Sequence, residues 1–193
     1  NNNKLRYKIN DRQFYKIKGY KIISVKRRSK YLLINLNKNI TILAHLGMTG
    51  KFFIINKNNK KQKTSFYYSI KKNESKHDHL TLYFGKGLKL VYNDVRKFGF
   101  LKLLKSKNIL RSDHLKFLGP EPLTKKFNFN YVVKFFLRNK NKIKNLLMDQ
   151  KFVSGLGNIY CNEILFLCKI HPLKIAKKIK KKKKKNIIEF TKK

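Results

Sequence analysis

Short apolar runs separated by polar turns fill the first half of the chain. They predict β-strands at residues 20–25, 31–36, 40–43, 51–55, 64–70, 79–84, 88–92 and 98–104. Strands of this length and spacing, without long helical segments between them, favour an antiparallel sandwich or barrel over a parallel sheet. We therefore expect the first half to be built from β-strands.

The hydrophobic period changes after residue 118. Tyr131, Val132, Phe135 and Phe136 recur at helical spacing, and residues 143–148 continue in the same way. The predicted fold class is α+β, with an antiparallel β-sandwich domain at residues 1–118 and a helical domain at residues 119–193. The glycine and prolines at residues 119–122 predict a hinge between the two domains. The lysine run at residues 180–185 is typical of a solvated helix face.

The charge of the chain points to a polyanionic partner. Of its 193 residues 41% are hydrophobic, which is enough for a core, and 49 Lys and Arg against 9 Asp and Glu leave a formal net charge of +40. Self-repulsion on this scale favours nucleic acid or an anionic membrane as a partner. Lysine and asparagine also crowd loops such as residues 56–61, so a background compositional bias contributes to the charge.

Several classes of protein are disfavoured by the remaining composition. No apolar run approaches the ~18 residues of a membrane span, and no signal-peptide pattern opens the chain, so we expect a cytoplasmic protein without a membrane partner. Cys161 and Cys168 lie seven residues apart on one predicted helix, about 10 Å along its axis, which is too far for a disulfide and suits two core residues. The chain has no Cys-x-x-Cys pair, so we expect no metal site.

Residues 146–163 combine an apolar helical segment, a glycine-rich turn and a second amphipathic run. Gly155 and Gly157 allow positive φ, and Asn158 stands where it could cap the following helix. Such a turn presents free N–H donors to an anion, and in this chain a nucleic-acid phosphate is the natural choice. A purely structural helical hairpin is the alternative.

Two short segments of the first half suggest further chemistry. Lys30 follows Arg27 and Arg28 at the start of an apolar strand, a setting suited to acid–base chemistry or simply to a charge-protected edge strand. His45 and Met48 lie in a loop flanked by glycines, where a methionine can wedge between stacked bases or join the core.

Charged and aromatic side chains alternate in two other segments. Arg96 and Phe98 should point to one face, pairing a cation that reaches phosphate with a ring that stacks on a base. His77 and His79 should likewise share a face. Two histidines alone make a poor metal site, so we expect phosphate contact or ordinary surface histidines.

Six segments together closely resemble the bacterial formamidopyrimidine-DNA glycosylases of the Fpg/Nei family, in the order and with the spacing of that family. They are residues 27–33, 45–50, 76–79, 94–99, 118–123 and 146–163. The resemblance implies a β-sandwich followed by a helix–two-turn–helix domain. It also implies base-excision repair: a DNA glycosylase that flips out and excises oxidised purines, 8-oxoguanine and formamidopyrimidines, and then cuts the abasic strand as an AP lyase.

The resemblance assigns roles by position. Lys30 matches a catalytic lysine that donates a proton in the cleavage steps, and Met48, Arg96 and Phe98 match the trio that fills the space left by the flipped base. His45, His77 and Asn158 match positions that hold the DNA backbone near the lesion. The DNA-binding positions also include Arg96 and the basic cluster Arg138, Asn139 and Lys140, although a cation would be expected at Asn139. The implied partner is double-stranded DNA with oxidised bases or abasic sites, bound by a monomer.

The chain departs from the family at both ends. The family's nucleophile is an N-terminal proline amine followed by a glutamate, whereas this sequence begins Asn1-Asn2-Asn3 and has prolines only at positions 120, 122 and 172. The family's C-terminal four-cysteine zinc finger has no counterpart, so structural zinc belongs to the full-length family member and no cofactor is expected in this chain. We expect an internal fragment that is impaired in catalysis.

Three alternatives stay open. An endonuclease VIII-type glycosylase for oxidised pyrimidines is the nearest enzyme, although Met48, Arg96 and Phe98 favour the formamidopyrimidine type. A non-catalytic remnant that binds damaged DNA is the second. An RNA- or ribosome-associated basic protein is the third, and it rests on charge alone.

Overall fold

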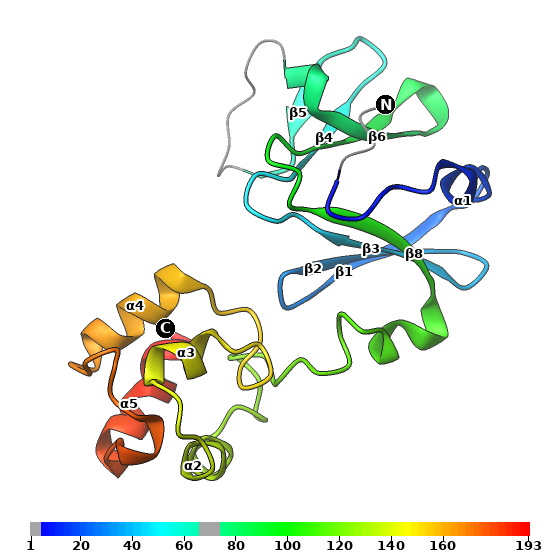
Figure 1. Cartoon of the computed structure of the whole chain (residues 1–193). Coiled ribbons are helices and arrows are strands. Elements are labelled where there is room, and N and C mark those ends of the chain that lie inside the picture. The colour runs from blue at the N-terminus through cyan, green and yellow to red at the C-terminus, as the bar shows by residue number, and fades with distance from the viewer. Residues whose placement is uncertain (1–4, 66–73) are drawn as a thin grey trace. The chain divides into compact units, whose positions relative to one another are not determined.

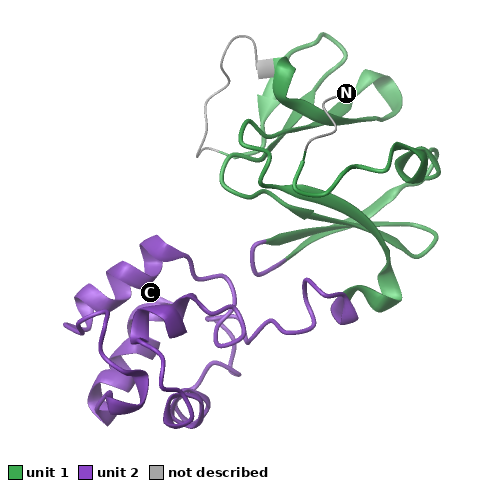
Figure 2. Cartoon of the chain, viewed as in Figure 1, with its two compact units in different colours: residues 1–27, 31–109 green, residues 28–30, 110–193 purple. Residues whose placement is uncertain are grey.

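The computed structural model describes residues 5–65 and 74–193 (Figure 1). The chain divides into two compact units, shown in Figure 2: unit 1 comprises Asn1–Arg27 and Tyr31–Ile109, and unit 2 comprises Arg28–Lys30 and Leu110–Lys193. Strands fill unit 1 and helices fill unit 2, which confirms the predicted α+β class with its β-sandwich followed by helices. The proposed domain boundary after residue 118 stays a prediction.

The described residues of unit 1 form two four-stranded sheets. The strand order is β1-β2-β3-β8 in one sheet and β5-β4-β7-β6 in the other. The pairs β2–β3, β3–β8, β4–β5, β4–β7 and β6–β7 are antiparallel. The strands are β1 Ile22–Arg28, β2 Tyr31–Leu36, β3 Ile40–His45, β4 Lys51–Ile55, β5 Lys61–Lys63, β6 Asp78–Tyr83, β7 Lys89–Asn93 and β8 Phe100–Lys105.

Side chains from both sheets form the core of unit 1. Ile42 and Ala44 on β3 and Tyr92 on β7 are fully buried, and the rings of Tyr92 and Phe52 lie 5.3 Å apart. A short helix, α1 (Asp11–Tyr15), adds Phe14 to this cluster. Burial of so many large apolar side chains is the main source of stability of a sandwich.

Most of the strand predicted at residues 64–70 falls on residues 66–70, which lie outside the described residues. The structure has a short strand just before them, β5, at Lys61–Lys63. A tight turn precedes β5, because the Asn56 side-chain oxygen accepts hydrogen bonds from the N–H groups of Asn58 and Lys60. The apolar pattern of the sequence did not indicate β5.

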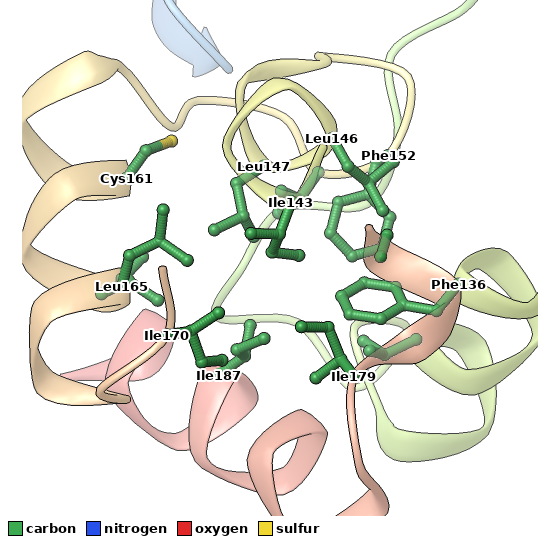
Figure 3. Packing of buried hydrophobic residues seen from close by; sticks show 14 of the residues in the cluster. Phe136, Ile143, Leu146, Leu147, Phe152, Cys161, Leu165, Ile170, Ile179 and Ile187 are labelled. Carbon is green, nitrogen blue, oxygen red and sulfur yellow. The ribbon is translucent and has the colours of Figure 1, made fainter. Parts of the chain in front are cut away.

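Unit 2 is a cluster of four helices around one apolar core (Figure 3). Phe152 packs among the aromatic rings of this core, with its ring 4.9 Å from that of Phe135 and 5.6 Å from that of Phe136. Cys161 and Cys168 are both buried and free, which confirms that they are core residues. The helices are α2 Phe129–Leu137, α3 Ile143–Met148, α4 Asn158–Leu167 and α5 Lys181–Lys192.

Two predictions about unit 2 were wrong. Residues 119–122 are not a free hinge: the Gly119 N–H donates to the Gln150 carbonyl, and a Cβ at Gly119 would lie 2.5 Å from the Lys151 carbonyl oxygen, so this segment is packed inside the unit. The lysine run is not purely a solvated face either. Lys184 is only 6% exposed, with its ammonium nitrogen 5.6 Å from the centre of the Phe136 ring.

Candidate nucleic-acid interface

The loop after β3 holds Met48 away from the core. The Gly50 N–H donates to the Leu46 carbonyl, which closes a tight turn, and Gly47 has a φ of +62°. A Cβ at Gly47 would lie 2.8 Å from both the Gly99 nitrogen and the Phe98 carbonyl carbon, so glycine is required for two loops to touch. The Met48 side chain is 71% exposed, which excludes the alternative of a core methionine.

The second loop, residues 94–99, presents a cation beside a ring. The Arg96 guanidinium lies 4.7 Å from the centre of the Phe98 ring, and Phe98 is 48% exposed. The two side chains thus share a side, as the sequence predicts, although the loop is not a strand and Lys97 adopts a left-handed φ of +62°. With Met48, this surface combines two exposed apolar groups and one guanidinium.

A buried carboxylate joins the two loops. Asp94 is fully buried, and its oxygens accept hydrogen bonds from the Thr49 hydroxyl, the Gly99 N–H and, at 3.3 Å, the Tyr92 hydroxyl. Burial raises the pKa of Tyr92 above its ordinary value, and the nearby Asp94 carboxylate raises it further, so this hydroxyl stays protonated. The sequence interpretation overlooked Asp94, Thr49 and Tyr92.

His45 is held with a defined tautomer at the end of β3. Its Nδ1 accepts a hydrogen bond from the Gly47 N–H, so in the neutral ring the proton lies on Nε2. The imidazole stacks on Phe100 at 5.8 Å and lies 5.0 Å from the Tyr31 ring. This packing fixes a donor nitrogen in place, as a phosphate contact requires.

His77 and His79 have different surroundings. His79 is buried, and its Nε2 lies 2.8 Å from the Asp94 carbonyl oxygen, so the expectation that it is a surface or phosphate-binding histidine was wrong. His77 ends a short 3-10 helix (Glu74–His77), and its carbonyl accepts from the Asp94 N–H. In the described part of the chain, the His77 Nδ1 is buried without a hydrogen-bond partner.

In unit 2, Arg28 anchors the turn that carries Lys30. One guanidinium nitrogen donates to the Glu121 carboxylate and the Ser154 hydroxyl, and the other to the carbonyls of Leu118 and Gly119. Glu121 also accepts the Ser29 N–H at 2.6 Å. A partly buried charge pair with this many hydrogen bonds orients the segment, and it leaves Lys30 exposed.

Gln150 connects this turn to the glycine-rich segment before α4. Its side-chain oxygen accepts from the Ser29 hydroxyl and from the Gly155 N–H, and its amide donates to the Leu156 carbonyl. A Cβ added at Gly157 would lie 3.2 Å from Lys30 Nζ. The structure therefore brings Lys30 next to the start of α4.

The predicted cap of α4 was wrong in detail. Gly155 has the expected positive φ of +98°, but Gly157 is extended at −119°, and Gly157 rather than Asn158 is the N-cap residue. Asn158 is the first residue of the helix, and no side chain caps it. Because Asn158 is exposed beside free helix N–H groups, it can face an anion.

Arg138, Asn139 and Lys140 lie on the connection between α2 and α3. Arg138 and Lys140 are exposed, and the Asn139 side-chain oxygen accepts from the Asn141 N–H. This connection precedes α3, whereas Gln150 follows it, so the six-residue helix α3, about 9 Å long, lies between them in the chain. These residues thus form a second basic segment of unit 2.

The overlooked polar residues had one signal in common. The chain has only 9 acidic residues, and five of them lie inside segments already singled out for other reasons: Asp78, Asp94, Glu121, Asp149 and Glu163. In a chain with 49 Lys and Arg, each acidic side chain is a candidate for a structural contact. Among the described residues, no group of three or more His, Cys, Asp or Glu side chains could hold a metal ion. Nor do they include a helix long and apolar enough to span a bilayer.

The comparisons with known proteins agree over both units. The family described as "Formamidopyrimidine-DNA glycosylase N-terminal domain" matches residues 1–101, and the "Formamidopyrimidine-DNA glycosylase H2TH domain" matches residues 118–193. A formamidopyrimidine-DNA glycosylase of Lactobacillus acidophilus is 42% identical over 165 residues, covering 86% of this chain and 55% of the relative. One from Rickettsia bellii is 38% identical over 188 residues, covering 97% and 64%.

Solved structures give the same result. The Fpg protein of Lactococcus lactis in complex with DNA containing an abasic site has a TM-score of 0.79 and 30% identity, covering 94% of this chain and 62% of that one. A complex of the same protein with DNA containing N7-benzyl-Fapy-dG matches equally well. The chain thus spans between about half and two thirds of the length of the proteins it matches.

Proposed function

We propose a function for this chain from its family, because it belongs to the formamidopyrimidine-DNA glycosylase family. The protein acts in base-excision repair as a DNA glycosylase. Its substrate is duplex DNA carrying oxidised purines, 8-oxoguanine and formamidopyrimidines, and it cuts abasic strands as an AP lyase. The Lactococcus lactis relatives bound to abasic-site and Fapy-dG DNA support this substrate class.

The single observation that carries the proposal is the exposure of Met48 and Phe98 beside Arg96. Exposed apolar side chains that gather in one place mark an interaction site, and these two lie on adjoining loops held by glycines and a buried carboxylate. They fit the space left in a duplex when a base is flipped out. Arg96 supplies a cation for the facing base or phosphate.

The other predicted residues contact the DNA backbone. His45 and His77 do so from unit 1, and Asn158 at the start of α4 does so from unit 2, joined by the basic segment Arg138–Asn139–Lys140. Lys30, adjacent to the same turn, acts as the proton donor in strand cleavage. The protein works as a monomer, and structural zinc belongs to the longer family members.

The isolated 193-residue chain binds damaged DNA but is impaired in catalysis. Lyase chemistry in the family uses a proline amine that forms a Schiff base with the sugar, and the prolines of this sequence lie only at positions 120, 122 and 172. Lys30 is a primary amine and substitutes poorly. A non-catalytic remnant that binds damaged DNA is therefore the second candidate.

Two measurements on the chain as it stands test the proposal. We expect tighter binding to a duplex containing a tetrahydrofuran abasic analogue or 8-oxoguanine than to the undamaged duplex at equal salt. Equal affinity for all three would refute damage recognition. Borohydride trapping on 8-oxoguanine duplex should give little covalent adduct. Adduct formation at the rate of a full-length family member would refute the impairment, and preference for thymine glycol would favour the endonuclease VIII type.

A further inference from the structure

The surroundings of Asp94 are unusual for a charge. Its side chain is fully buried in a chain of net charge +40, yet in the described structure its carboxylate binds neutral donors. Burying a carboxylate is costly unless several hydrogen bonds replace its water. Each donor therefore has to be held in a fixed position, and this requirement constrains the segments that supply them.

Those donors lie on the two loops with exposed side chains. Thr49 follows Met48 directly, and its hydroxyl donates to the Asp94 carboxylate while accepting the Arg96 N–H at 3.0 Å. The Gly99 N–H, next to Phe98, donates to the other carboxylate oxygen at 2.8 Å. One buried group thus fixes the neighbours of Met48, Arg96 and Phe98.

The main chain of Asp94 extends the same connection to the histidines. Its N–H donates to the His77 carbonyl at 3.0 Å, and its carbonyl pairs with the buried His79 ring. Each of these bonds involves a backbone group or a buried side chain, so the arrangement is already formed without a ligand. Pre-organisation of this kind lowers the ordering cost of binding.

We propose that Asp94 is a positioning residue for lesion recognition, which holds the Met48 loop and the Arg96–Phe98 loop in one rigid arrangement that can enter the space of a displaced base. The proposal rests on the proposed function, because it assigns how the void-filling side chains are kept ready. Asp94 itself does not touch DNA. Its contribution passes through the Thr49 hydroxyl and the Gly99 N–H.

The chain offers a matched set of variants. Thr49→Val removes the hydroxyl that joins Asp94 to the Arg96 loop, and Thr49→Ser keeps it. Thr41→Val is the control. The Thr41 hydroxyl, like that of Thr49, has two hydrogen-bond partners, but these are the side chains of Asn35 and Ser106, outside both loops. Thr41 is fully buried in unit 1 and Thr49 is partly buried, so the control removes a hydroxyl from a more enclosed site. Asp94→Ala removes the whole connection.

The measured quantity is lesion preference, the ratio of dissociation constants for undamaged and tetrahydrofuran-containing duplexes. A second readout is the fluorescence of 2-aminopurine placed opposite the lesion, which rises when the base is unstacked. We expect Thr49→Val to lower the preference about fivefold and to reduce the fluorescence rise. Thr49→Ser and Thr41→Val should keep a lesion preference close to that of the original chain. Asp94→Ala should lower the preference at least as much as Thr49→Val does.

The outcomes are distinguishable. If the original chain shows no lesion preference, the proposed function fails and this proposal falls with it. If the original chain prefers the lesion but Thr49→Val equals it, or Thr41→Val loses as much as Thr49→Val, the positioning role is refuted while the function stands. If Asp94→Ala fails to fold, the comparison of the two Thr49 variants with Thr41→Val still tests the positioning role.

Discussion

Gly99 and Gly85 lie in the same unit in opposite surroundings. A Cβ added at Gly99 would overlap the Tyr92 hydroxyl oxygen and lie 2.6 Å from the His45 carbonyl, whereas one at Gly85 would meet nothing within 4 Å. Because overpacking a closed site forces side chains and backbone to move, we expect Gly99→Ala to lower the free energy of unfolding by about 2–3 kcal/mol. Gly85→Ala should change it by no more than about 0.5 kcal/mol. Urea unfolding measures both, and equal losses would contradict the packing described.

The two buried cysteines should make the free energy of unfolding fall at alkaline pH. Burial raises the pKa of Cys161 and of Cys168 to about 11, although Lys30 and Lys183 respectively oppose the rise. Since the folded state favours the neutral thiol, its stabilising contribution is complete below the unfolded pKa, near 9, and is lost as pH rises through 11. The unfolding free energy should therefore fall more steeply above pH 9 in the original chain than in the Cys161→Ala/Cys168→Ala variant. Parallel curves would show that the thiols are not in the apolar environment described.

Residues with a local chemical signature were predictable from the sequence, and their partners were not. Met48 lies between glycines and proved exposed, and both cysteines proved buried. Asp94 and Gln150 bind residues 45 and 121 positions away, and nothing in the neighbouring sequence indicates those contacts. His79 was misplaced for the same reason, since its burial depends on a carbonyl 15 positions along the chain.

At the scale of elements, α2 and α4 begin in different ways. The Asn128 side-chain oxygen accepts the Tyr131 N–H at 3.0 Å and caps α2, whereas Asn158 lies inside α4 and caps nothing. We expect Asn128→Ala to cost about 1 kcal/mol of stability. Asn158→Ala should leave the melting temperature nearly unchanged but weaken binding to abasic-site DNA. A stability loss at Asn158 equal to that at Asn128 would contradict this assignment.

Element types followed from the sequence because hydrophobic periodicity is local, whereas element ends depended on bonds to other parts of the chain. The strand at residues 51–55 was predicted with its observed limits. β5 follows the Asn56 turn, which the apolar pattern does not indicate, and α4 begins one residue earlier than predicted because Gly157, extended at a φ of −119°, is its N-cap residue. Hydrogen bonds to distant parts of the chain likewise hold residues 119–122 within unit 2.

At the scale of the whole molecule, the affinity for DNA that comes from the net charge of +40 is distinct from the preference for damaged DNA. Charge attracts any polyanion, and a protein with 6–10 phosphate contacts loses about 10³–10⁵ in affinity between 50 and 200 mM salt. Met48 and Phe98 carry no charge, so the part of binding that depends on them should not respond to salt. Overall affinity and lesion preference should therefore vary independently.

Binding to undamaged and tetrahydrofuran-containing duplexes, titrated with salt, tests this separation. We expect both affinities to fall steeply while their ratio changes by less than about threefold. Phe98→Ala should lower the ratio and leave the salt slope unchanged, whereas Arg138→Ala should reduce the slope by about one and leave the ratio unchanged, because a phosphate contact is sequence-independent. A ratio that collapses together with the affinity would mean that charge alone holds the DNA. Equal binding of RNA duplex at matched salt would then favour a basic RNA-associated protein, since neither partner would engage the exposed Met48 and Phe98 side chains.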